Sequence, residues 1–211
     1  MKLAILGTGA VGKALAGAFL DRGHDVVLGT RDPDATRARE GWPARLTLAS
    51  YADAAVDADV VVNATSGEGA LPALDAAGPG LDGKVVVDVA NPLDFSAGFP
   101  PTLLVKDTDS LAEQLQRAHP GARVVKALNT MANEVMVDPA RVGDGDTSVF
   151  VAGDDADARA VVRGLLEELG WRDIVEFESL VAARGLEMWL PLWLQLMGRF
   201  GRTNFNLKVV R

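Results

Sequence analysis

Three glycines near the start of the chain, Gly7, Gly9 and Gly12, have the spacing of a dinucleotide-binding loop. They stand between an apolar run and an alanine-rich helical pattern, a placement that favours a binding loop over an ordinary tight turn. In such a loop the first glycine makes the turn, the second lets the backbone approach a pyrophosphate, and the third lets helix and strand pack closely. The helix N-terminus adds N–H groups and a positive dipole end. The predicted pyrophosphate site comprises Gly7, Thr8, Gly9, Ala10, Val11 and Gly12.

The end of the second predicted strand decides which adenosine ribose such a loop accepts. An acidic side chain there would bind a free 2′-hydroxyl, but this strand ends in Thr30 and Arg31. A hydroxyl followed by a guanidinium suits a 2′-phosphate, because Arg presents a planar fork of donors to phosphate oxygens. We therefore predict NADP(H) as the cofactor, with Arg37 as a candidate for an additional contact. The alternative is that Arg31 is a solvated loop cation near Asp32 and Asp34.

Small or polar side chains follow three later apolar runs. They form three groups, Asn63 with Ala64 and Thr65, Asn91 with Pro92, and Asn129 with Thr130 and Met131. Open α/β sheets bind ligands at the carboxyl ends of their strands. We therefore predict that these residues face the nicotinamide ring or its ribose. The alternative is that Asn and Thr only cap the strand ends.

Elements that could position these residues are visible in the alternation of short β-branched runs with helical patterns. Several of the runs are apolar throughout, which is typical of strands covered on both faces. The fold class predicted is α/β, a doubly wound, mostly parallel sheet of the Rossmann type with a small C-terminal extension. Strands are expected at Lys2–Leu6, Val26–Gly29, Val60–Ala64, Val85–Val89, Val124–Leu128, Ser148–Ala152 and Ile174–Phe177, and helices at Val11–Asp21, Leu111–Ala118, Asp155–Leu169 and Leu180–Phe200.

We expect residues 1–211 to form a single dinucleotide-binding domain, because no linker separates two parts of the chain. The C-terminal part, from about residue 179 to 211, is expected to form a helix and tail. There Trp189 and Trp193 lie one helical turn apart, with a kink expected at Pro191. This surface could line a pocket for a flat heterocycle, form a homodimer interface, or be a helix buried on the sheet.

The composition limits the partners. The formal charge is −8, with 21 basic and 29 acidic residues, so we expect no nucleic-acid partner. The chain has no cysteine, which excludes disulfides and thiolate sites and fits a reducing compartment, so a cytoplasmic location is expected. The chain starts without a signal-peptide pattern, and its most apolar late stretch is too short to span a bilayer, so no membrane partner is expected.

The sequence offers no catalytic or metal-binding cluster. Its two histidines, His24 and His119, fall in separate predicted turns, and no nucleophile or general base stands out. We therefore predict no metal site and no catalytic side chain. Reducing a ketone generally requires a proton donor, whereas hydride transfer between two cofactors chiefly requires that their rings be stacked in order. This favours a reaction between two cofactors, with a second small-molecule cofactor as the substrate.

With these residues assembled, the chain resembles the family of NADPH-dependent reductases of the deazaflavin coenzyme F420. The resemblance covers nearly the whole length. It rests on the segments Leu6–Lys13, Gly29–Arg31, Val125–Thr130, Val151–Asp155, Leu190–Leu192, Arg199–Gly201 and Leu207–Lys208.

The resemblance implies that Thr8 to Gly12 hold the pyrophosphate and that Thr30 and Arg31 hold the 2′-phosphate. It also implies that three segments surround the nicotinamide and the second substrate, and that hydride moves directly from nicotinamide C4 to deazaflavin C5 without a side-chain acid. These segments are Ala64–Thr65, Asn91–Pro92 and Asn129–Met131. Two other functions stay open, an NADPH-dependent reductase of a small imine or carbonyl and a non-catalytic NADP(H) sensor.

Overall fold

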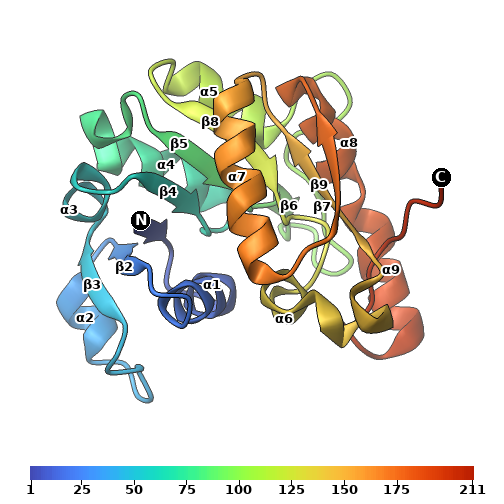
Figure 1. The fold of residues 1–211 in the computed structure, drawn as a ribbon, viewed down its shortest axis with the longest axis horizontal. Helices are drawn as coiled ribbons and strands as arrows, with labels where there is room; N and C mark the ends of the chain where they lie inside the picture. The colour runs from blue at the N-terminus through green and yellow to red at the C-terminus, as the bar shows by residue number, and fades with distance from the viewer.

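The protein, described over residues 1–211 by a computed structural model, is built on one eight-stranded sheet (Figure 1). The strand order is β10-β9-β8-β5-β4-β1-β2-β3, and every neighbouring pair is parallel except β8 and β9. This confirms the predicted α/β class. The strands are β1 (Lys2–Leu6), β2 (Asp25–Thr30), β3 (Thr47–Ser50), β4 (Val60–Asn63), β5 (Val85–Asp88), β8 (Arg123–Ala127), β9 (Ser148–Ala152) and β10 (Asp173–Phe177).

Helices cover both faces of the sheet, and the apolar runs of the central strands are buried between them. One face packs against α1 (Ala10–Leu20), α6 (Asn133–Val137) and α7 (Ala156–Leu169). The other face packs against α3 (Tyr51–Val56), α4 (Gly67–Ala77) and α5 (Leu111–Ala118). The remaining helices are α2 (Pro33–Arg37), α8 (Ala183–Met188) and α9 (Leu190–Phe200), and a small hairpin consists of β6 (Leu93–Asp94) and β7 (Thr102–Leu103). None of these helices has the length and apolar character that a membrane crossing requires.

The sheet reverses its order at β1, which lies between β2 and β4. The carboxyl ends of β1 and β4 therefore diverge into loops on opposite sides, and such a switch point is where open α/β sheets bind ligands. The glycine loop follows β1, and Thr65 follows β4. The fold brings these two segments together although more than fifty residues of chain separate them.

Two helix ends are capped by local residues, and one predicted helix needs correction. Gly170 ends α7 with φ +100°, as expected of a left-handed cap, and the Ser110 hydroxyl accepts from the backbone N–H of Glu113 at the start of α5. The single helix expected over Leu180–Phe200 is divided into a short 3₁₀ turn, α8 and α9. The break falls at Trp189, since Pro191 in the first turn of α9 cannot donate to a preceding carbonyl.

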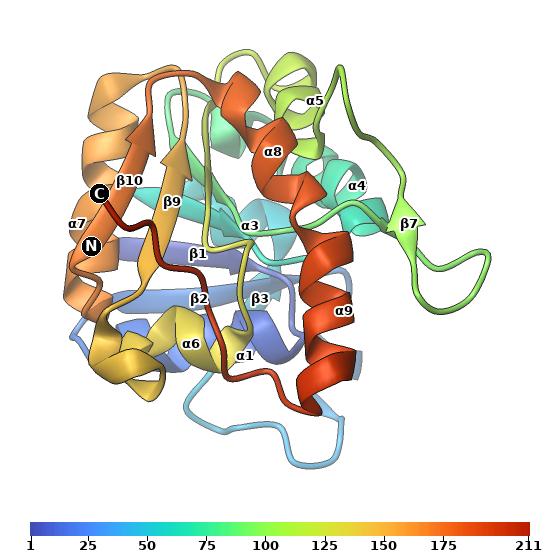
Figure 2. The same ribbon diagram turned by 90° about the vertical axis from the view of Figure 1, so that its right-hand side faces the viewer.

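The C-terminal tail, residues 202–211, runs back from α9 across the molecule to the start of β9 (Figure 2). Backbone N–H of Ser148 donates to Leu207 O at 2.8 Å, and the Val209 N–H donates to Ser148 Oγ at 2.9 Å. The Asp173 carboxylate accepts from Ser148 Oγ at 2.6 Å, and it also accepts from Lys208 and Arg211. Asp173 is therefore the centre of the tail's attachment.

The attachment of the tail should weaken as the pH becomes acidic. The hydrogen bond from the Ser148 hydroxyl, with help from Lys208 and Arg211 and against the effect of burial, lowers the pKa of Asp173 to about 2. Because this is below the unfolded value of about 3.9, the contribution of Asp173 is present above that value and is lost as pH falls toward about 2. The Val209 amide resonance, followed by NMR, should titrate over this range.

Asp173→Asn should loosen the tail already at neutral pH and abolish the titration. Asp146→Asn is the matched control, because Asp146 contacts only Lys208 and is largely exposed. An unchanged Val209 resonance in Asp173→Asn would contradict the assignment.

Candidate functional site

The glycine loop is built by close backbone packing. Gly7 has φ +117°, donates its N–H to Gly29 O at 3.0 Å, and lies so near β4 that a Cβ there would stand 2.5 Å from Ala64 O. A Cβ on Gly12 would stand 2.1 Å from Gly7 O. Both positions therefore exclude any side chain, for reasons within the protein itself.

Gly9 is different, because nothing in the protein requires a glycine there. Its φ of −77° suits any residue, and a Cβ built on it meets no atom within 4 Å. It precedes Ala10, the first residue of α1, and no side chain caps that helix. The first N–H groups of α1 therefore lack a side-chain acceptor within the protein and stand beside open space. A cradle of this kind fits an anion that approaches the backbone closely.

A cleft of about 900 Å³ opens over this loop. Arg31 and Arg39 stand on its rim, and the Arg39 Nη1 donates to Thr8 Oγ1 at 3.3 Å. Tyr51 lies nearby; its burial raises the pKa of the phenol, although the positive charge of Arg31 acts in the opposite direction. Two cations with no carboxylate paired to either make this end of the cleft suitable for a phosphate.

The side chains around Arg31 explain which arginines face the cleft. Thr30 is buried, and its Oγ1 lies 3.0 Å from Thr36 Oγ1, so it supports the last turn of α2. Arg37 donates to Asp34 at 2.7 Å and does not line the cleft. Arg39, which the sequence pattern did not single out, occupies the place considered for Arg37. It follows the end of α2, where helical spacing no longer predicts direction.

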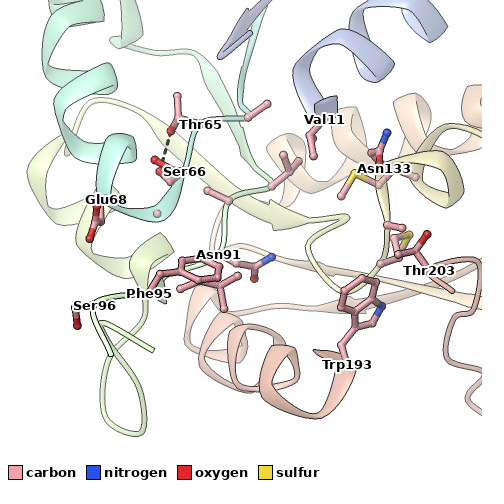
Figure 3. A pocket seen from close by; sticks show the side chains of 18 residues that line it. Val11, Thr65, Ser66, Glu68, Asn91, Phe95, Ser96, Asn133, Trp193 and Thr203 are labelled. Atoms are coloured by element: carbon pink, nitrogen blue, oxygen red, sulfur yellow. Dashed lines mark hydrogen bonds between the residues drawn. The ribbon is translucent and has the colours of Figure 1, made fainter. Parts of the chain in front are cut away.

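A second cavity of about 530 Å³ adjoins the first (Figure 3). The two share the segment that follows β4, including Ala64, Thr65 and Glu68. Apart from Glu68 its lining is uncharged, and most of it is apolar. The wall residues outside the shared segment include Val11, Val89, Ala90, Asn91, Leu93, Phe95, Met131, Ala132, Met136, Trp193 and Thr203. Such a lining suits a flat, largely apolar ring.

Asn91 and Asn129 are joined by reciprocal hydrogen bonds. Asn91 Nδ2 donates to Asn129 O at 2.9 Å, and Asn129 Nδ2 donates to Asn91 Oδ1 at 3.0 Å and to Leu186 O at 3.0 Å. Asn129 is 1% exposed and does not reach the cavity. Leu128, with φ +61°, turns the chain at this point. Asn129 therefore positions Asn91 and α8 beneath the cavity.

A buried ionic cluster lies under the same wall. Lys126 Nζ donates to Asp88 Oδ2 at 2.8 Å and to Ala90 O at 2.5 Å, and lies 2.8 Å from Glu187 Oε1. Burial alone would lower the pKa of Lys126, but the two carboxylates outweigh it and the pKa is raised, so the ammonium stays charged. Glu187 also accepts from the N–H groups of Leu111 and Ala112 at the start of α5.

The geometry separates the predicted site residues into two groups. Those that line a cavity are Gly7, Thr8, Gly9, Val11, Thr30, Arg31, Ala64, Thr65, Asn91 and Met131. Ala10, Gly12 and Asn129 do not line either cavity, and they act in helix initiation, loop packing and support. Residues that the sequence patterns missed include Arg39, Tyr51, Ser66, Glu68 and Phe95, since no motif marks them.

A doubly wound sheet whose glycine loop opens onto a polar cleft and an adjoining apolar cavity defines a dinucleotide-dependent oxidoreductase. The sequence profile of the family described as NADP oxidoreductase, coenzyme F420-dependent, matches residues 2–92. An F420-dependent NADP reductase of Methanocaldococcus jannaschii is 30% identical over 99% of this chain and 98% of that protein. The chain belongs to the coenzyme F420-dependent NADP oxidoreductase family, as the resemblance predicted.

One solved structure agrees with this assignment, and a second shares the fold. The crystal structure of a candidate F420-dependent NADP reductase from Arthrobacter sp. FB24 is 52% identical, with a TM-score of 0.98 and coverage of 100% of both chains. An imine reductase of Streptomyces aurantiacus is 22% identical, with a TM-score of 0.64 over 95% of this chain and 64% of that one. The second likeness shows a shared fold alone.

Proposed function

We propose that this protein transfers hydride directly between NADP(H) and the deazaflavin coenzyme F420, with a flavin as the other candidate for the second substrate. The observation that carries the proposal is the junction of the two cavities at Thr65, with an anion cradle on one side and an apolar wall on the other. When both are bound, NADPH supplies a hydride from nicotinamide C4 to C5 of the deazaflavin. The protein's part is to bind, orient and shield the two rings.

The polar cleft would hold the phosphates. The loop from Gly7 to Gly12 would receive the pyrophosphate, because Gly9 leaves its approach open and α1 offers unpaired N–H groups. Thr30 would fix the strand end, and Arg31 with Arg39 would bind the 2′-phosphate. Neither arginine has a carboxylate partner, so each is free to pair with the ligand.

The apolar cavity would hold the nicotinamide against the second ring. Ala64, Thr65, Asn91 and Met131 line it, with Asn129 as the support of Asn91. The C-terminal segment from about residue 179 would complete the cavity, since Trp193 and Thr203 stand on the side opposite Thr65 (Figure 3). Stacking two rings between apolar side chains excludes water and sets the distance for transfer, which needs no side-chain acid.

Arg31→Ala should weaken NADPH binding by about 1.5–3 kcal/mol, the contribution of a charge-assisted contact, and leave NADH binding nearly unchanged. Arg39→Ala should act in the same direction. Arg37→Ala is a matched control from α2, which lies between Arg31 and Arg39 in the chain, because Arg37 is paired with Asp34 outside the cleft. Isothermal titration calorimetry measures all three. Equal losses for NADPH and NADH in Arg31→Ala would refute the 2′-phosphate role.

The reaction itself is tested by stopped-flow oxidation of NADPH, followed by absorbance, first with coenzyme F420 and then with FMN. Rapid oxidation that depends on the deazaflavin supports the proposal. Tight NADPH binding without transfer to either acceptor would overturn it, and would favour the small imine or carbonyl reductase or the sensor.

We also propose a cellular location and an oligomeric state. A cytoplasmic location agrees with a chain that has no cysteine. A homodimer agrees with the apolar side chains that α9 exposes, Leu192 at 52% and Phe200 at 51%. Light scattering after size-exclusion chromatography gives the oligomeric state, and a monomer would exclude the homodimer.

A further inference from the structure

The direction of the hydrogen bonds at Thr65 is determined by the protein. Thr65 Oγ1 lies 2.7 Å from Asn63 Oδ1 and 3.2 Å from Ser66 O. A hydroxyl carries one hydrogen, and both of these neighbours are acceptors. Whichever of them receives it, the hydrogen is used inside the protein. Toward the cavities Thr65 can therefore offer only lone pairs (Figure 3).

The orientation of the Asn63 amide, on which this depends, follows from its other neighbours. Asn63 Nδ2 donates to Asp88 Oδ1 at 2.8 Å, and its Oδ1 accepts from the Thr65 N–H at 3.3 Å. The reversed amide would set an oxygen against the Asp88 carboxylate and an NH₂ against the Thr65 N–H. The side chain of Asn63 is completely buried, so no water can relieve either conflict.

Asp88 is in turn held as an acceptor. Its Oδ2 accepts from Lys126, and its Oδ1 accepts from Asn63 and from the Ala90 N–H at 3.2 Å. Lys126 has only donors, and all of them have acceptors in the cluster described above. The direction of each hydrogen bond is therefore determined along the whole series, from the buried Lys126 ammonium through Asp88 and Asn63 to the Thr65 hydroxyl at the cavity wall.

We propose that the chain from Lys126 through Asp88 and Asn63 holds the Thr65 hydroxyl as an acceptor toward the cleft, so that Thr65 selects a cofactor by a hydrogen-bond donor on its nicotinamide riboside. The inference rests on the proposed NADP(H) site. Thr65 lies where the polar cleft meets the apolar cavity, and in the proposed site this part of the cofactor would pass there. A phosphate oxygen, which is an acceptor, would find no donor at the Thr65 hydroxyl. Asn63 and Asp88 are positioning residues.

Two groups on the cofactor could be the donor, the carboxamide NH₂ and a ribose hydroxyl. Calorimetry with NADP⁺, with its nicotinic acid analogue and with an analogue lacking the 2′-hydroxyl of the nicotinamide ribose separates them. Wild type should bind the analogue that lacks the donor about 10-fold more weakly than NADP⁺, since the Thr65 hydroxyl is then left as an acceptor without a donor. In Thr65→Val the ratio of the two dissociation constants, analogue over NADP⁺, should fall toward one.

The analogue whose ratio falls identifies the donor. Thr65→Ser should keep the wild-type ratios, and Thr203→Val is the matched control, because Thr203 lines the same cavity without these partners. Unchanged ratios in a folded Thr65→Val would overturn the inference while NADP⁺ binding still supports the proposed site. Failure of the wild type to bind NADP⁺ would instead contradict the proposed function.

The role of Asn63 has a separate readout. Asn63→Ala removes the nearer acceptor and leaves the Thr65 hydrogen only the longer contact to Ser66 O, at 3.2 Å, with which an acceptor on the ligand can compete. The nicotinic acid analogue should then gain at least about threefold in affinity relative to NADP⁺, since the hydroxyl can donate to its carboxylate. A purely structural role would weaken both ligands alike, so an unchanged ratio would overturn the role of Asn63.

Discussion

Replacing Lys126 with methionine should lower the free energy of unfolding by about 3–5 kcal/mol, the largest stability effect that we expect from a single substitution. The side chain is completely buried, and its removal leaves Asp88 and Glu187 without their cation. Methionine fills much of the volume, so the loss reports on the charges more than on a cavity. Urea denaturation followed by circular dichroism measures it.

Lys208→Met is the control for this experiment. Lys208 also contacts two carboxylates, Asp146 and Asp173, but its side chain is 35% exposed. Such an ion pair contributes about 0–1 kcal/mol. A loss for Lys126→Met that is no larger than the loss for Lys208→Met would show that the buried cluster tolerates unpaired carboxylates.

Gly9→Val should reduce NADPH affinity by at least about 100-fold, or roughly 2.7 kcal/mol, and leave the fold intact. The protein has room for the side chain and a compatible backbone at this position, so the valine would occupy only the place of the ligand. Gly164→Val is the matched control, because a Cβ at Gly164 in α7 also meets no atom within 4 Å and lies outside both cavities. Normal binding by a folded Gly9→Val would place the pyrophosphate elsewhere.

The parts of the fold that could be predicted from sequence are those determined locally. The apolar runs of β1, β4 and β5 and the glycines of the loop indicated strands buried on both faces and a turn into α1, and the structure has them. The reversal between β8 and β9 could not be predicted, because an apolar strand has the same pattern in either direction. The short β3 and α3 were missed since neither is long enough to show a period.

The residues of the candidate site could also be predicted from sequence only where local position determines them. Arg31 follows a strand directly, so its position could be predicted, whereas Arg39 reaches the cleft only through the path of the chain after α2. Asn129 was expected at the cavity but turns inward, because its amide completes the hydrogen bonds of Asn91 and Leu186. Nothing in the spacing of Lys126 marks it as a buried cation, since its carboxylate partners come from β5 and α8.

The packing of the glycine loop has a consequence for how this protein can evolve. Gly7, Gly12 and Ala64 pack closely, so that a side chain added at either glycine would meet backbone of the loop or of the segment that follows β4. A single substitution at either glycine would therefore disrupt the loop unless a second substitution made room for the new side chain. Arg31 and Arg39 are exposed and have no ion-pair partner in the protein, and the contact of Arg39 with the loop is a single hydrogen bond to Thr8 Oγ1. Cofactor preference can thus drift or be re-engineered at the rim, while the loop beneath stays unchanged across such variants.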